Sequence, residues 1–240
     1  MNNIRFYPFN DHTAGFAPEP KPATRFMPEW YRHQPASVSE ELALPQGGST
    51  GTIKRCMPVF DMMTAGYIMS VPMDIYIDAT NPAKIEWSVP MSMKNFGMDM
   101  VATHSPEQVS HYPVDERIYH KSIFRIMPFW SVETDPGYST IFTHPFHRDP
   151  VPFKMFPAVV DTDTFISDGH LSMYIEKDFK GIIKQGTPLI QVIPFKREEW
   201  SMSLVEPKTA KEIIQKQRHS IRSAFRHAYK EKYRSKKEWK

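Results

Sequence analysis

The sequence predicts a mainly β protein, a single-domain antiparallel sandwich or partly closed barrel that ends in an amphipathic α-helix. Proline content is the first reason, because the chain has 22 prolines against 10 glycines, and proline breaks helix interiors but is tolerated at strand edges and in turns. The second reason is that about nine short apolar or alternating segments follow one another without intervening helical patterns. The third is the change to a 3.6-residue apolar period near the C-terminus.

Three regions are expected along the 240 residues, a length that suffices for one domain with a sizeable core. Residues 1–51 are rich in proline and aromatic residues, and they predict an irregular arm packed on the body, because disordered segments are poor in aromatics. One helical turn is expected in this arm at residues 28–32. Residues 52–205 are expected to form the β-rich core domain, and residues 206–240 a basic amphipathic helix and tail.

The first half of the core predicts a short helix followed by a strand meander. Residues 52–56 alternate weakly, as in a strand. Residues 58–65 begin with proline and are followed by Gly66, which favours a helix with a glycine C-cap. Between residues 91 and 119 the apolar pattern is lost, which favours a long surface excursion. Consecutive paired strands are expected at residues 67–71, 74–78 and 84–89.

The second half of the core predicts further strands and one tight turn. Asp135-Pro136-Gly137 is typical of a type II turn, so the flanking segments 130–134 and 138–142 are expected to pair as a hairpin. A second turn is expected at residues 184–187. The remaining strands are expected at residues 122–126, 158–161, 171–175 and 188–195.

The positive charge of the chain is concentrated in its C-terminal region. Residues 206–240 contain 12 Lys and Arg against 4 Asp and Glu, a net charge of +8, whereas the preceding residues contain 18 against 23, a net charge of −5. In the helix expected from Pro207, one stripe of cations is expected to contact nucleic acid, an acidic partner protein or the acidic body of the same chain. This stripe consists of Lys211, Arg218, Arg222, Arg226 and Lys230.

A separate apolar face of the same helix includes Ile214, Ile221 and Phe225. An exposed apolar stripe needs a cover, so the body or a second copy in a homo-oligomer is expected to pack on it. Cys56 is the only cysteine, which rules out an intrachain disulfide. No secretory signal pattern and no apolar run of about 20 residues is present, so an intracellular, membrane-free setting without secretion is expected.

Three segments resemble, in order and spacing, the core of the dUTPase and dCTP-deaminase superfamily: residues 135–139, 158–163 and 183–192. The resemblance implies a β-clip fold and a nucleotide-binding or nucleotide-hydrolysing protein that uses Mg²⁺. The Ser-x-x-x-Arg phosphate clamp and the closing glycine-rich motif of that superfamily have no clean match in this chain.

This resemblance implies specific roles for five side chains. Asp161 and Asp163 would be the catalytic carboxylates, with Asp161 near the sugar or a water. Tyr138 and Ser139 would border the phosphates, and Gln191 would line the ligand pocket. The residues themselves leave another interpretation open, in which a strand runs into a turn and the two carboxylates accept backbone N–H groups.

His147-Arg148-Asp149 has the His-x-Asp spacing of Fe(II)/2-oxoglutarate oxygenases, in which two nearby ligands and a distant histidine hold the iron. The third ligand is not evident, since His170 is close in sequence and His219 lies on the basic helix. The other interpretation is that His147 and Asp149 are surface polar residues in a loop, with no metal bound. Whether the protein is an enzyme stays open at this point.

Five phrases spread over the chain resemble an uncharacterised protein family found in tailed-phage genomes, which has no assigned activity. They are Pro28 to Tyr31, Thr52 to Pro58, Gly66 to Ile68, Asp135 to Ser139 and Gln191 to Trp200. The resemblance implies a viral protein that acts in the host cytoplasm or as a virion component. The leading hypothesis is therefore a phage-type β-rich binding or interaction protein, and the alternatives are a nucleotide-handling β-clip protein and an iron oxygenase.

Overall fold

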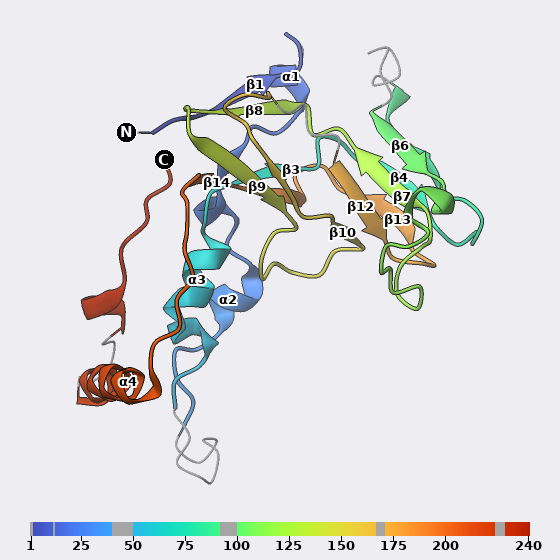
Figure 1. Ribbon diagram of the computed structural model, residues 1–240. Helices are drawn as coiled ribbons and strands as arrows, with labels where there is room; N and C mark the ends of the chain where they lie inside the picture. Colours follow the sequence, from blue (N-terminus) through green and yellow to red (C-terminus); the bar gives the residue numbers. More distant parts are fainter. Residues whose placement is uncertain (1, 12, 40–49, 92–99, 167–170, 224–228) are drawn as a thin grey trace. The chain divides into compact units, whose positions relative to one another are not determined.

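The computed structural model describes residues 2–11, 13–39, 50–91, 100–166, 171–223 and 229–240 (Figure 1). Within these ranges it has fourteen strands in four antiparallel sheets and a C-terminal helix. The prediction of a mainly β fold with a C-terminal helix is therefore confirmed. The sheets do not close into a barrel.

The largest sheet has five strands and is built around the long strand β14. This central strand is mostly apolar, and Leu189, Ile190 and Val192 are fully buried, as expected for a strand covered on both faces. The order is β11 (Ala158–Val160), β9 (Tyr138–Thr143), β14 (Pro188–Lys196), β3 (Tyr67–Ser70) and β2 (Lys21–Pro22).

Three smaller sheets complete the β structure. Four strands pair in the order β10 (Phe153–Met155), β12 (Leu171–Ile175), β7 (Ile123–Ile126) and β6 (Val101–His104). Three strands pair in the order β13 (Lys180–Ile183), β4 (Ile75–Asp78) and β5 (Glu86–Ser88), and two strands pair as β1 (Ile4–Pro8) and β8 (Trp130–Thr134).

One apolar core joins these sheets. It includes Phe124 of β7, Phe142 of β9, Met173 of β12 and Ile190 of β14, each at most 1% exposed. Successive residues of a strand face opposite sides, so each strand contributes alternate side chains to one packed layer. The core is thus made where the inner faces of different sheets meet.

The helices are short except for α4. They are α1 (Thr13–Phe16), η1 (Ala23–Phe26), α2 (Glu29–His33), η3 (Ile53–Arg55), α3 (Met57–Met63), η5 (Pro106–Val109), α4 (Pro207–Ser223) and η6 (Tyr229–Tyr233). Among the described helices, none combines the length and apolar character that a membrane crossing requires. The expected helix before Gly66 is α3, which ends at Met63, and Gly66 has a left-handed φ of +65°, which glycine adopts easily.

The chain forms two compact units. The first contains residues 1–30 and 63–197 together with Trp239, and the second contains residues 31–62, 198–238 and 240. Within the second unit, Arg234 donates to both carboxylate oxygens of Asp61 at 2.6–3.1 Å, and Lys237 contacts the same carboxylate at 3.2 Å. Part of the basic tail is thus neutralised by an acid near the end of α3.

The expected pairing of segments 130–134 and 138–142 as a hairpin around Gly137 is wrong. The turn itself forms, because Tyr138 N donates to Asp135 O at 3.3 Å and Gly137 has a φ of +85°. However, β8 pairs with β1, whereas β9 pairs with β11 and β14. The strands separate because each has a long-range partner, and five residue pairs join β1 to β8.

Four further local expectations differ from the structure. Residues 53–55 form a 3₁₀ turn instead of a strand, because Thr52 Oγ1 accepts from Lys54 N as an N-cap. The expected meander is incomplete, since β4 and β5 pair but β3 belongs to the five-stranded sheet. The region expected to be a surface excursion contains strand β6, and the arm contributes β1 and β2 to the sheets.

Candidate functional site

Four of the residues implied by the dUTPase resemblance lie together at the start of β9. Ser139 Oγ donates to Asp161 Oδ1 at 2.6 Å, and Gly137 N donates to Asp163 Oδ2 at 2.8 Å. Tyr138 neighbours both groups in sequence, and its hydroxyl contacts the Asn2 side chain. The spacing of the two segments therefore corresponds to real proximity across the β9–β11 pair.

Arg197, which the sequence did not single out, is the centre of this cluster. Its guanidinium donates to Tyr138 O at 3.0 Å, Ser139 Oγ at 3.0 Å and Asp163 Oδ1 at 2.9 Å. It also forms an ion pair with the second oxygen of Asp163. Arg197 directly follows β14, whose Lys196 pairs with Tyr138, so the strand register brings it here.

The two aspartates of this cluster differ in their surroundings. Asp163 has a side chain that is only 5% exposed, and Arg197 together with the Gly137 N–H lowers its pKa to about 2. Asp161 has a side chain that is 62% exposed and lies 3.4 Å from Arg197. Internal donors occupy the carboxylate oxygens of Asp163, as expected if the carboxylate serves a turn that follows a strand. The assignment of Asp163 as a catalytic carboxylate stays a prediction.

Gln191 lies away from this cluster. It pairs with Thr143 on β9, whereas Ser139 pairs with Phe195, so about 13 Å of strand separates the two positions. Gln191 is fully buried, its Oε1 accepts from Phe146 N at 3.0 Å, and its Nε2 donates to Ala65 O at 2.7 Å. This side chain connects the loop after β9 to the end of the α3 segment.

The His-x-Asp motif lies in the connection between β9 and β10. His147 has a φ of +53°, and its backbone oxygen accepts from Trp30 Nε1 at 2.8 Å. Asp149 Oδ2 accepts from Glu29 N at 3.4 Å. Within the described ranges, which omit His170, no three His, Cys, Asp or Glu side chains form a group suited to a metal ion. The iron alternative stays a prediction.

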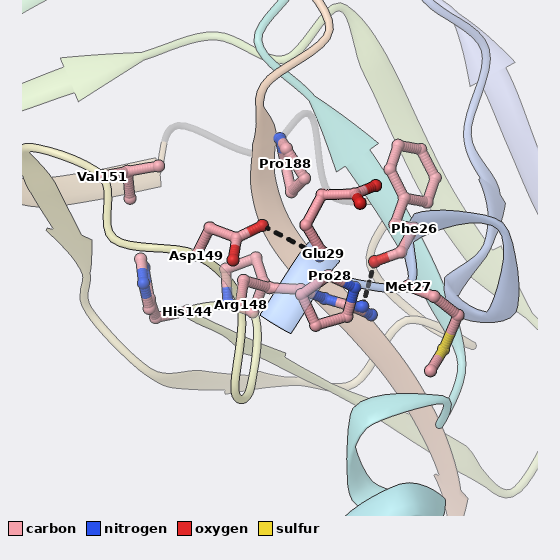
Figure 2. A pocket seen from close by; sticks show the side chains of 10 residues that line it. Phe26, Met27, Pro28, Glu29, His144, Arg148, Asp149, Val151 and Pro188 are labelled. Carbon is pink, nitrogen blue, oxygen red and sulfur yellow. Dashed lines mark hydrogen bonds between the residues drawn. The ribbon is translucent and has the colours of Figure 1, made fainter. Parts of the chain in front are cut away.

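A cavity of about 240 Å³ opens between this connection and the segment from η1 to α2 (Figure 2). Its walls are mostly apolar, and four polar side chains interrupt them: Glu29, His144, Arg148 and Asp149. Figure 2 shows Asp149 directed at the backbone of Glu29, with His144 on the other side of Arg148. Apolar walls with a few polar groups are typical of ligand sites, although most such sites are larger.

Arg148, the middle residue of the His-x-Asp motif, lines this cavity and joins two chain segments beside it. Its guanidinium donates to Ala23 O at 3.1 Å and Met63 O at 2.6 Å, and it also contacts Phe26 O. Burial lowers the pKa of Arg148 to about 10, so it stays a cation at neutral pH. No sequence pattern predicts this role, because the acceptors are backbone carbonyls of two distant segments.

His144 adds a buried imidazole to the cavity wall. Its Nδ1 accepts from Met155 N at 3.4 Å, which places the proton of the neutral ring on Nε2. Burial and, to a smaller extent, the charge of Lys154 lower the pKa of His144 below its usual value. The folded protein therefore favours the neutral ring.

Acidification is expected to destabilise the protein through His144. The folded-state pKa is below the unfolded value of about 6.5, so the unfolded chain takes up the proton first, and stability present above that pH is lost as the pH falls. Urea unfolding at about pH 7.5 and pH 5.5 measures this loss. The loss of stability between the two pH values should be smaller in His144→Gln than in the unmodified protein. It should be unchanged in His111→Gln, because His111 is exposed. Equal losses in all three proteins would contradict this expectation.

The residues of the predicted basic stripe lie in the second unit. Lys211 and Arg218 are exposed on α4, and Lys230 is exposed in η6. Arg222 belongs to α4, but its side chain is not among those described, and Arg226 lies outside the described residues. The described side chains of the stripe are thus exposed.

An exposed apolar segment connects β14 to α4. Trp200, Met202 and Leu204 are 88%, 89% and 91% exposed. They alternate with Ser201 and Ser203 in a stretch that has no helix or strand of its own. On α4 itself, Ile213 and Ile214 are also exposed. Large apolar side chains that share one stretch of chain in this way are typical of interaction sites.

Comparisons with known proteins give no family for this chain. No protein-family model matches it, no curated protein is similar to it, and no solved structure matches its fold.

Proposed function

We propose that this chain is a β-rich binding protein that works by assembly, and that the C-terminal segment 198–206 joins it to a second copy of itself. The observation that supports the proposal is the nearly complete exposure of Trp200, Met202 and Leu204. Leaving three large apolar side chains in water is unfavourable by roughly 1.5–3 kcal/mol each relative to burial. A partner surface removes that cost.

The pattern of this segment fits strand addition. Its apolar residues occur at every second position, so in an extended conformation they lie on one face and the serines on the other. A peptide of this kind adds to a free sheet edge, where the backbone gives hydrogen bonds and alternate side chains fill hydrophobic sites.

The chain itself offers suitable edges. β11 is an end strand of the five-stranded sheet and exposes Val159, and β13 is an end strand of the three-stranded sheet and exposes Ile182. Free strand edges favour pairing with another chain. A second copy therefore supplies both the donor segment and the acceptor edge.

The basic helix fits the same function. Its exposed Ile213 and Ile214 extend the apolar surface beyond residue 206, and its cations suit an acidic partner or nucleic acid. In a phage-type protein, as the sequence resemblance implies, such an assembly would act in the host cytoplasm or in the virion.

Replacing both Trp200 and Leu204 by serine is expected to convert the oligomer into a monomer of 28.0 kDa. The reason is that the double variant removes most of the apolar face while leaving the sheets untouched. Sedimentation equilibrium over a concentration series, up to about 100 µM, measures the mass, since assembly depends on concentration.

The matched control for this experiment is the double variant Ser201→Asn and Ser203→Asn, which changes the opposite face of the same segment and should keep the oligomer. A monomeric mass for the unmodified protein at the highest concentration would refute self-assembly. An oligomer that persists in the Trp200 and Leu204 variant would move the interface elsewhere.

A further inference from the structure

The outer face of the four-stranded sheet carries both rings and cations. Lys154 of β10 pairs with Tyr174 of β12, and Phe156 N donates to Ser172 O at 3.0 Å, which continues the same ladder. Arg125 of β7 pairs with Ser172 from the other side. Because alternate residues share a face, these side chains lie opposite the buried Met155, Met173 and Phe124.

Two tyrosines from the connection between β6 and β7 extend this face. Tyr112 stacks on Phe156, with ring centroids 5.1 Å apart and planes inclined by 7°, and Tyr119 stacks on Tyr174 at 5.3 Å. Phe156 and Tyr174 contact each other at 4.4 Å. The four rings form one continuous cluster, which we call the aromatic platform.

The aromatic platform is open to solvent at one end. Tyr174 is buried, Phe156 and Tyr119 are half-buried, and Tyr112 is 46% exposed. The ring of Tyr112 thus packs on the half-buried ring of Phe156 and leaves part of its own surface in water. A flat ligand that stacks there would not have to order a free side chain, which lowers the entropic cost of binding.

Two of the cations around the platform form no ion pair with a described residue. Asp115 pairs with Arg117 at 2.8 Å and Glu116 pairs with Lys121 at 3.2 Å, so these acids are balanced. Exposed Lys154 and half-buried Arg125 have no ion pair with any described residue. Glu176 borders the platform, because its backbone forms a bridge with Tyr119. Its carboxylate repels an anionic ligand, which favours binding on the side of Lys154.

We propose that the aromatic platform binds single-stranded nucleic acid, with bases stacked on Tyr112 and phosphates held by Lys154 and Arg125. Stacking on aromatic rings tolerates any base, because every base has a π-face, and unpaired cations match the phosphate chain. A duplex hides its base faces, so single strands are the fitting form. DNA and RNA share this chemistry.

Fluorescence anisotropy with labelled single strands of about 15 nucleotides, dT and rU, tests the proposal on the full-length protein. Tyr112→Leu should weaken binding by about tenfold, because it removes a stacking surface, whereas Tyr112→Phe should bind within about twofold of the unmodified protein. Thermal melting of both variants controls for folding. Binding of either strand supports the proposal, and the strand that binds more tightly, dT or rU, identifies the natural form.

Charge variants separate the platform from the basic helix. Lys154→Gln should reduce the slope of log affinity against log salt by about 1. The double variant Lys211→Gln and Arg218→Gln serves as the comparison, because it changes only α4. No binding of either strand would overturn the proposal. Binding of a duplex as tight as that of a single strand would overturn it as well. So would a result in which the α4 variant loses binding while Tyr112→Leu binds as well as the unmodified protein.

Discussion

Gly66→Ala is expected to lower the free energy of unfolding by about 3–5 kcal/mol, the largest effect of any glycine substitution considered for this protein. Gly66 has a φ of +65°, and an added Cβ would lie 2.0 Å from Val192 O and 2.9 Å from Val192 C. These are backbone atoms of β14, the central strand of the five-stranded sheet. They cannot move without breaking the ladder, so overpacking adds to the conformational strain.

The control for this variant is Gly137→Ala. Gly137 has a φ of +85°, but an added Cβ there meets nothing within 4 Å. Only the conformational strain then applies, and about 1 kcal/mol is expected. Guanidinium chloride unfolding of both variants measures the difference. Similar losses at the two positions would show that the contact with β14 does not determine the effect at Gly66.

Arg148→Met is expected to lower the free energy of unfolding by about 3 kcal/mol, because hydrogen bonds from a charged group contribute roughly 1.5–3 kcal/mol and their acceptors lose a partner. The guanidinium binds three backbone carbonyls, those of Ala23, Phe26 and Met63. It thereby ties η1 to the end of α3 in the first unit. Methionine keeps the apolar stem but supplies no donor.

Two controls accompany Arg148→Met in the same denaturation experiment. Arg148→Lys keeps the charge, but its single ammonium group does not reproduce the planar fork, so an intermediate loss is expected. Arg117→Met removes an arginine whose side chain is 89% exposed, and no measurable change is expected there. If Arg148→Met is as stable as Arg117→Met, the three carbonyl contacts are not a source of stability.

Local sequence signals were reliable where the local chain determines the structure. Gly66, which follows α3, and Gly137, which lies in the expected turn, both have a positive φ. The apolar segments of β7, β12 and β14 are strands close to their expected bounds. In these cases the physical cause is contained within a few residues, such as a φ that only glycine adopts easily or an apolar run.

Strand pairing was not predictable in the same way. The turn at Gly137 favours a hairpin, but β8 instead pairs with β1, where Arg5 contacts Glu133 at 2.6 Å. The alternation of Ile4 and Phe6 with Arg5 and Tyr7 was present in the sequence. The density of prolines nearby made an irregular arm the more natural interpretation, and only long-range contacts decide between the two.

The candidate site shows the same division. Spacing and resemblance brought Ser139, Asp161 and Asp163 into one group, and they do lie together. Arg197 was missed because it is 34 residues from Asp163 in the chain and reaches it only through the register of β14 with β9. The same register separates Gln191 from the group.

The sequence by itself determined the mainly β composition, the positions of the long apolar strands, the glycine-dependent turns and the concentration of cations near the C-terminus, because each follows from short-range patterns of residues. Only the tertiary structure decided which strands pair, that Arg148 and Arg197 are the connecting cations, and that Tyr112 stacks on a sheet face. Those features depend on contacts between segments far apart in the chain, which local propensity does not encode.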